Sequence, residues 1–239
     1  MLGPPAEDWG ERDYAGEAAA VLREGRDYPA KQRERLFESW NVTCPICDYK
    51  FGTARAGKGT VRGAVELDGR ETFVAGNDHL FRYWMCPACN FCDKAETFEN
   101  RRASGVTNLK GCAPPKRYAS YFDIPYSEIL RRAEQWLIAQ KKSDAELADF
   151  YLYGVWVATE CANDQAARYY RSMARARFLD AYHFEPTAQS AFLAAELMRQ
   201  LGDAHGAESW HTVAEGHPAP PELKARIAKC RDLVRGMKP

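Results

Sequence analysis

Two C-P-x-C pairs constrain this chain more than any other feature of its sequence. The first pair is Cys44-Pro45-Ile46-Cys47 and the second is Cys86-Pro87-Ala88-Cys89. Two residues between the cysteines allow a tight turn, and a zinc ion binds four thiolates at the corners of a tetrahedron. The repeated pattern therefore predicts one metal centre in which these four cysteines are the ligands. Zinc is the expected metal, and iron is the alternative.

The chain has eight cysteines, but their spacing favours metal binding over disulfides, because a reducing cytosol keeps thiols free. Cys92 lies three residues after Cys89 and is an alternative ligand. Cys86, Cys89 and Cys92 also match part of an iron–sulfur pattern, with Cys112 as the fourth ligand. That interpretation leaves the first pair without a role. The last two cysteines lie in helical patterns and are expected to be small buried residues: Cys161 and Cys230.

Residues 41–110 have the character of strands, and they are expected to form a small zinc-ribbon domain. Two alternating runs, 60–67 and 70–74, flank Asp68-Gly69, which predicts a hairpin with positive φ at both turn residues. Residues 79–85 are expected to form a third strand that enters the second pair. The hairpin accounts for the long gap between the pairs. His79 is expected at the surface, outside the site.

From residue 125 onward the apolar period is helical. The pattern predicts six helices, over 128–142, 145–160, 165–183, 187–201, 204–215 and 221–234, with Ser127 as the N-cap of the first. Before the cysteine pairs, residues 1–40 are expected to be a polar arm with short helices at 15–22 and 31–40. Residues 111–122 are expected to be a linker, and residues 123–239 a helical domain. The expected fold class is therefore α+β.

An internal repeat occurs within the helical half. Small residues recur at Gly154, Ala166, Ala195 and Ala207, where two antiparallel helices must approach closely. The segment from Leu201 to Ala214 resembles the tetratricopeptide helix pair. The expected architecture is a tetratricopeptide-like array, and a generic helical bundle with alanine-rich seams is the alternative.

Charge and hydropathy exclude several functional classes. Lys and Arg total 33 and Asp and Glu total 33, so the net charge of zero disfavours bulk binding of nucleic acid or acidic membranes. No apolar run approaches the ~20 residues that cross a bilayer. The first nine residues lack the basic and apolar regions of a secretory signal. We therefore expect a cytoplasmic protein without membrane contact.

The sequence shows no catalytic constellation. It contains no H-E-x-x-H, G-x-S-x-G or Walker motif, and its acidic pairs lie on amphipathic helices. We therefore expect no enzymatic activity and no small-molecule substrate. A protein partner is expected, and a face that carries Arg168, Arg171 and Arg175 is a candidate surface for an acidic peptide or phosphate. The alternative is a solvated arginine face.

The order of these parts resembles domain-of-unknown-function family 2225, bacterial proteins with a zinc ribbon and a tetratricopeptide-like half. The matching segments are residues 42–51 and 83–91, followed by helix pairs, over roughly 40–235. The resemblance implies that Cys44, Cys47, Cys86 and Cys89 bind the metal, and it implies no known activity. Asp48 and Asn90 replace the family's glycines, but both residue types tolerate left-handed backbone. Alanine is expected near position 92, where this chain has a cysteine.

Three functional hypotheses follow. The first is a non-enzymatic scaffold or adaptor with structural zinc and a concave protein-binding helical surface. The second is a rubredoxin-like electron carrier with iron in the same site. Rubredoxins are strongly acidic between their cysteine pairs, however, whereas residues 41–110 carry ten Lys or Arg and eight Asp or Glu. The third is a nucleic-acid-binding zinc ribbon.

Overall fold

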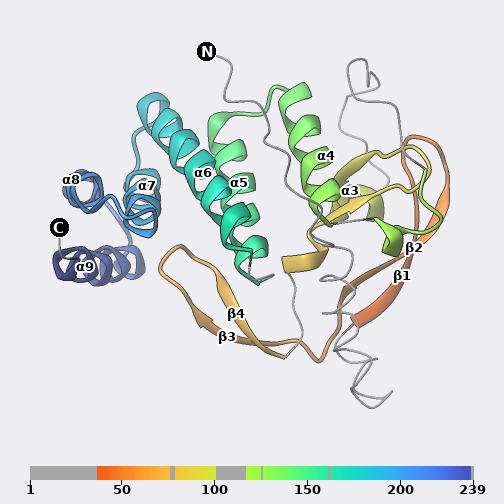
Figure 1. Ribbon diagram of the computed structural model, residues 1–239, viewed down its shortest axis with the longest axis horizontal. Coiled ribbons are helices and arrows are strands. Elements are labelled where there is room, and N and C mark those ends of the chain that lie inside the picture. Colours follow the sequence, from red (N-terminus) through yellow and green to blue (C-terminus); the bar gives the residue numbers. More distant parts are fainter. Residues whose placement is uncertain (1–36, 76–78, 101–116, 125, 161–162, 238–239) are drawn as a thin grey trace. The chain divides into compact units, whose positions relative to one another are not determined.

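The computed structural model describes residues 37–75, 79–100, 117–124, 126–160 and 163–237. The chain divides into two compact units. The cysteine unit consists of Met1–Gly59 and Phe81–Ala133, and the helical unit consists of Thr60–Leu80 and Glu134–Pro239. Antiparallel hairpins precede a series of helices, which confirms the expected α+β fold (Figure 1).

Two hairpins form the framework of the cysteine unit. Strand β1 (Phe37–Thr43) pairs with β2 (Lys50–Ala56), and strand β5 (Tyr83–Met85) pairs with β6 (Cys92–Lys94). The turn of each hairpin contains one C-P-x-C pair. The unit is completed by α3 (Ala95–Glu99), the 3-10 turn η2 (Tyr121–Asp123) and the first part of α4 (Tyr126–Ala139).

The core of the cysteine unit is aromatic, with Phe98 of α3 in contact with both hairpins. Its ring centroid lies 5.9 Å from that of Phe51, 6.1 Å from that of Trp84 and 5.3 Å from that of Phe91. Only 1% of Phe98 is exposed. Such rings bury large apolar areas, so this cluster joins the hairpin of the first cysteine pair to that of the second.

A third hairpin lies between the two pairs in the sequence and belongs to the helical unit. Strand β3 (Val61–Val65) pairs with β4 (Glu71–Ala75), and the 3-10 turn η1 (His79–Phe81) follows. Glu66 N–H donates to Arg70 C=O (2.8 Å), and Gly69 N–H donates to Glu66 C=O (3.0 Å). Of the two turn residues, Gly69 alone has a positive φ, of 89°. The loop therefore has three residues with a glycine bulge, and the predicted two-residue turn is wrong.

The helical unit contains five helices beyond α4 within the described residues: α5 (Asp144–Glu160), α6 (Asp164–Phe184), α7 (Ala188–Gln200), α8 (Ala204–Glu215) and α9 (Pro221–Gly236). Asn163, Thr187 and Asp203 cap α6, α7 and α8 by accepting backbone N–H groups. None of the described helices combines the length and apolar character needed to span a membrane.

Small residues lie where consecutive helices pack together. A β-carbon added at Gly154 of α5 would lie only 2.6 Å from the ring of Tyr170 in α6. The other three repeated small residues are also buried: Ala166, Ala195 and Ala207. The glycine is therefore required by the close approach of α5 to α6.

Several segments differ from their predicted boundaries. Phe37–Trp40 begins β1 instead of ending a helix, and α4 begins at Tyr126, so Ser127 lies inside it. The segment expected as one strand over 79–85 consists of η1 and the short β5. Residues 41–110 were expected to form one domain, whereas Thr60–Leu80 belongs to the same compact unit as the helices. Residues 1–36 of the expected arm and residues 111–116, the first half of the expected linker, lie outside the described residues.

Candidate metal centre

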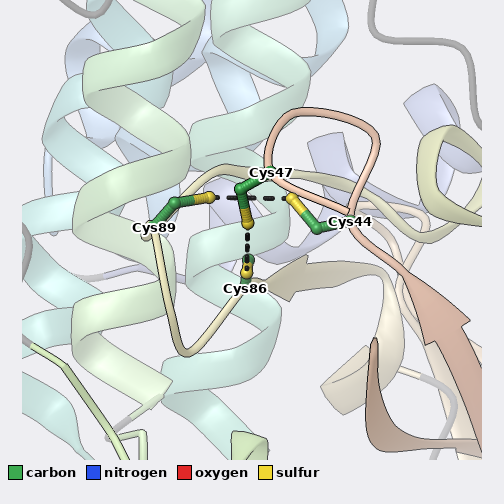
Figure 2. A group of neighbouring side chains, drawn as sticks. All are labelled: Cys44, Cys47, Cys86 and Cys89. Carbon is green, nitrogen blue, oxygen red and sulfur yellow. Dashed lines mark hydrogen bonds between the residues drawn. The ribbon is translucent and has the colours of Figure 1, made fainter. Parts of the chain in front are cut away.

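The four cysteines of the two C-P-x-C pairs lie together, with all their sulfur atoms within 4.8 Å of one another. The Sγ atoms of Cys44 and Cys89 are 3.6 Å apart, and those of Cys47 and Cys86 are 3.7 Å apart (Figure 2). In each of these two pairs, one sulfur belongs to the first cysteine turn and the other to the second. The cluster therefore connects two hairpins that are distant in the sequence.

These distances fit a metal centre and exclude a disulfide. A disulfide needs sulfur atoms about 2.05 Å apart. Four thiolates around one zinc ion, each at about 2.3 Å, place neighbouring sulfurs about 3.8 Å apart in a regular tetrahedron. The observed 3.6 Å and 3.7 Å separations are close to that edge length. The donor set is four thiols, which favours zinc or iron over oxygen-binding metals.

The two cysteine turns share one hydrogen-bond pattern. In the first, Cys44 N–H donates to Tyr49 C=O (2.9 Å) and Asp48 N–H donates to Cys44 C=O (3.1 Å). In the second, Cys86 N–H donates to Phe91 C=O (2.8 Å) and Asn90 N–H donates to Cys86 C=O (2.9 Å). This shared hydrogen-bond pattern shows that both turns position their two thiols with the same backbone geometry.

A family model described as "Uncharacterized protein conserved in bacteria (DUF2225)" matches residues 37–236, which include both cysteine turns and all the described helices. The chain belongs to the DUF2225 family. This confirms the family that the sequence resembles. Searches of curated proteins and of solved structures each found no match.

Hydrogen bonds within this DUF2225 cluster favour the thiolate of Cys44 and the protonated thiols of Cys86 and Cys89, and burial opposes ionisation of all three. Hydrogen bonds from Cys86 and Cys89 lower the pKa of the Cys44 thiol, since they stabilise its thiolate. The same contact with Cys44 raises the pKa of the Cys86 and Cys89 thiols. Backbone N–H of Ile46 also points at Cys44 Sγ (3.5 Å). A cation can replace the shared protons and keep the sulfurs close together.

The structure does not include Cys92 in this cluster. Its thiol is buried and donates to Ile129 C=O (3.3 Å), and burial raises its pKa well above the ordinary value. Cys230 is likewise buried, and its thiol donates to a Glu196 carboxylate oxygen at 2.7 Å. Cys112 and Cys161 lie outside the described residues.

The three arginines proposed for partner binding lie on α6 with different exposure. Arg168 is exposed, whereas Arg171 and Arg175 are partly buried. Arg171 Nε donates to Gln200 Oε1 (2.8 Å), and burial lowers its pKa. Arg168 is therefore the most accessible of the three.

His79 lies in the helical unit and is not a member of the cysteine cluster. Its ring packs against Trp156 with centroids 5.3 Å apart, and its Nε2 lies 2.9 Å from Glu71 C=O. It is half-buried rather than a surface residue.

Proposed function

We propose that this DUF2225 chain is a non-enzymatic metal-binding scaffold, in which a structural zinc ion stabilises the cysteine unit and the helices bind another protein. The main support for the proposal is that the four cysteine sulfurs all lie within 4.8 Å of one another. Strands β5 and β6 have only three residues each, so this hairpin has few backbone hydrogen bonds of its own. Metal–thiolate bonds would supply the missing stabilisation.

A structural role agrees better with this donor set than a catalytic one. Four protein ligands complete a tetrahedron, so no position is left for water or substrate. Zinc is also inert in redox reactions. The cysteines would therefore stabilise the fold, and interactions with other molecules would use other surfaces.

A rubredoxin-like electron carrier is the second candidate, because four thiolates also suit iron. The charge of the segment that contains both cysteine pairs counts against it. Residues 41–110 have ten basic and eight acidic side chains, instead of the acidic surface that such carriers present to redox partners. Nucleic-acid binding is disfavoured by the zero net charge of the whole chain.

The helical unit supports the binding part of the proposal. Consecutive helices pack through small residues such as Gly154 and Ala207, as in repeat proteins that bind other proteins along their helices. Arg168 is exposed on α6 and would attract acidic groups of a partner. Protein binding would then depend on the helices, and metal binding on the cysteines.

Elemental analysis of the purified chain tests the metal centre. We expect one zinc ion per chain and a colourless solution, and we expect the Cys44→Ser variant to lose the metal. A red protein with iron in its native host would favour the electron carrier, and a metal-free wild-type chain would contradict both. For the helices, we expect cross-links from a copurifying protein to map to α6 and to weaken in Arg168→Glu. Recovery of no partner under gentle conditions would count against binding.

A further inference from the structure

The hairpin β3–β4 connects the two cysteine turns in sequence but belongs to the helical unit. Thr60–Leu80 groups with the helices, whereas β2 before it and β5 after it belong to the cysteine unit. The chain between Cys47 and Cys86 therefore leaves the cysteine unit, pairs as a hairpin within the helical unit, and returns. A metal ion bound by both cysteines would close this segment into a loop.

The tip of the hairpin is anchored by charged groups of α5 and α9. Arg70 forms an ion pair with Glu160 at 2.9 Å, in which both side chains are mostly buried. The guanidinium of Arg226 donates from Nε to Leu67 C=O (3.0 Å) and from Nη2 to the same oxygen. These bonds fix the loop that contains Gly69 against the two helices.

The base of the hairpin is anchored by aromatic residues of α5. The ring of His79 lies against Trp156, with centroids 5.3 Å apart, and against Phe73 of β4, at 5.0 Å. The hydroxyl of Tyr153 donates to His79 C=O. Tip and base therefore both depend on side chains of the helical unit.

The hairpin has little stability of its own. All five residues of β3 are exposed, including Val61 and Val65, and the sheet has only two strands with an irregular register. Isolated two-stranded hairpins are marginally stable in water. The β3–β4 hairpin must therefore be stabilised by its contacts with α5 and α9 and by whatever holds the two ends of the hairpin together.

We propose that metal binding and docking of this hairpin are coupled, so that loss of the metal weakens the docking of β3–β4 on α5 and α9. The inference rests on the proposed metal binding. Val61 pairs with Ala75, which shortens the open chain between Cys47 and Cys86. A metal ion bound to the cysteine cluster would hold these two cysteines together. The open loop between Cys47 and Cys86 is about 38 residues long, and pairing of β3 with β4 shortens it to an effective length of about 25. Through chain entropy alone, the shorter loop raises the equilibrium constant for closure by the metal about twofold. Folding of the flanking strands around the metal adds to this factor.

The coupling works in both directions, because linkage between two binding equilibria is reciprocal. A docked hairpin strengthens metal binding, and a bound metal strengthens docking. In the metal-free chain, the part of α5 that contains Trp156 and Glu160 is uncovered more often than in the metal-bound chain. The hairpin therefore covers this surface, and the metal shifts the equilibrium toward the covered state.

Hydrogen exchange and zinc affinity test the proposal on the full chain. With zinc removed by a chelator, we expect amides of residues 61–75 to exchange at least about twofold faster. We expect the double variant Arg70→Ala/Arg226→Ala to bind zinc at least about twofold more weakly in competition with a chromophoric chelator. Arg231→Ala is the matched control, because it breaks an α8–α9 ion pair with Glu215 and leaves the hairpin anchors intact.

The outcomes separate this inference from the proposed function. If zinc binds but the exchange of residues 61–75 does not respond to it, the coupling is wrong and the metal scaffold stands. Equal zinc affinities of the wild type and the double variant would also overturn the coupling, as would an equal loss in Arg231→Ala. A wild-type chain that binds no zinc would overturn both proposals.

Discussion

Asp48 and Asn90 occupy the same position in the two cysteine turns, and both have left-handed backbone, with φ values of 56° and 59°. Each follows the second cysteine of its pair, where its N–H donates to the carbonyl of the first cysteine. This conformation directs the chain back toward its partner strand. Asp and Asn tolerate it better than most residues, but they are not as free as glycine.

Substitutions at Asp48 should therefore separate backbone strain from side-chain chemistry. Asp48 is exposed, so Asp48→Gly should keep or raise the free energy of unfolding, whereas Asp48→Ala should be about 1 kcal/mol less stable than the glycine variant. Urea unfolding of the metal-loaded protein measures the difference. Equal stabilities of the alanine and glycine variants would show that the turn does not require this conformation.

Serine substitutions should distinguish the cluster from the nearby buried thiol. Cys89→Ser removes one of four clustered sulfurs, so metal content should fall and the melting temperature should drop. Cys92→Ser retains a donor for Ile129 C=O and should keep one metal ion per chain. Elemental analysis and thermal unfolding measure both effects. Loss of metal from Cys92→Ser would instead identify Cys92 as a ligand.

Buried His211 should make the helical unit sensitive to acid. It is fully buried on α8 against Phe192, and neither of its ring nitrogens has a hydrogen-bond partner in the described part of the chain. Burial lowers the pKa of His211 below its usual 6.5. The surrounding charges partly offset one another, since Glu196 and Glu215 oppose the shift while Arg199 and Arg231 promote it.

The sign of the pH effect follows from proton binding. As pH falls below 6.5, the unfolded chain binds a proton at this histidine before the folded chain does, so stability is lost. His211→Phe should remove this loss, which is at most about 1.4 kcal/mol between pH 6.5 and 5.5. Unfolding free energies of both proteins at pH 7.5 and 5.5 measure it. The exposed His205, replaced by Gln, is the control, and a parallel pH dependence of wild type and His211→Phe would refute the prediction.

The contact of Gly154 with Tyr170 predicts a packing effect. Gly154→Ala would place a β-carbon 2.6 Å from the tyrosine ring and should lower stability by about 1–3 kcal/mol. Gly236→Ala is the control, because no atom lies within 4 Å of its added β-carbon. This variant should be neutral or slightly stabilising. Chemical denaturation measures both, and equal effects would mean that α5 and α6 do not require the glycine.

Much of the local structure could be predicted from the sequence because single residues determine it. The C-P-x-C spacing predicted the convergence of Cys44 and Cys47 with Cys86 and Cys89, and four sulfurs do converge. The starts of α6, α7 and α8 were predicted to within one residue, and Asn163, Thr187 and Asp203 act as their N-caps, whereas the start of α4 was misplaced because Ser127 lies inside that helix. Tolerance of left-handed backbone by Asp48 and Asn90 was also confirmed.

The sequence could not show which unit each segment would join. Contacts such as Arg70 with Glu160 and Arg226 with Leu67 span long sequence separations and have no local signal. The role of Phe98 was missed for the same reason, because a single phenylalanine in a polar stretch has no periodic pattern. The hairpin turn was misjudged because Asp68 accepts the N–H of Arg70 (3.0 Å), and only Gly69 takes the left-handed conformation.

X-ray absorption spectroscopy at the metal edge of the purified protein would show whether the four cysteines bind a single metal ion. We expect one zinc ion with four sulfur neighbours at about 2.3 Å and no nitrogen or oxygen ligand. A first shell with fewer sulfurs, or mass spectrometry showing a disulfide between Cys44 and Cys89 in the native protein, would contradict it.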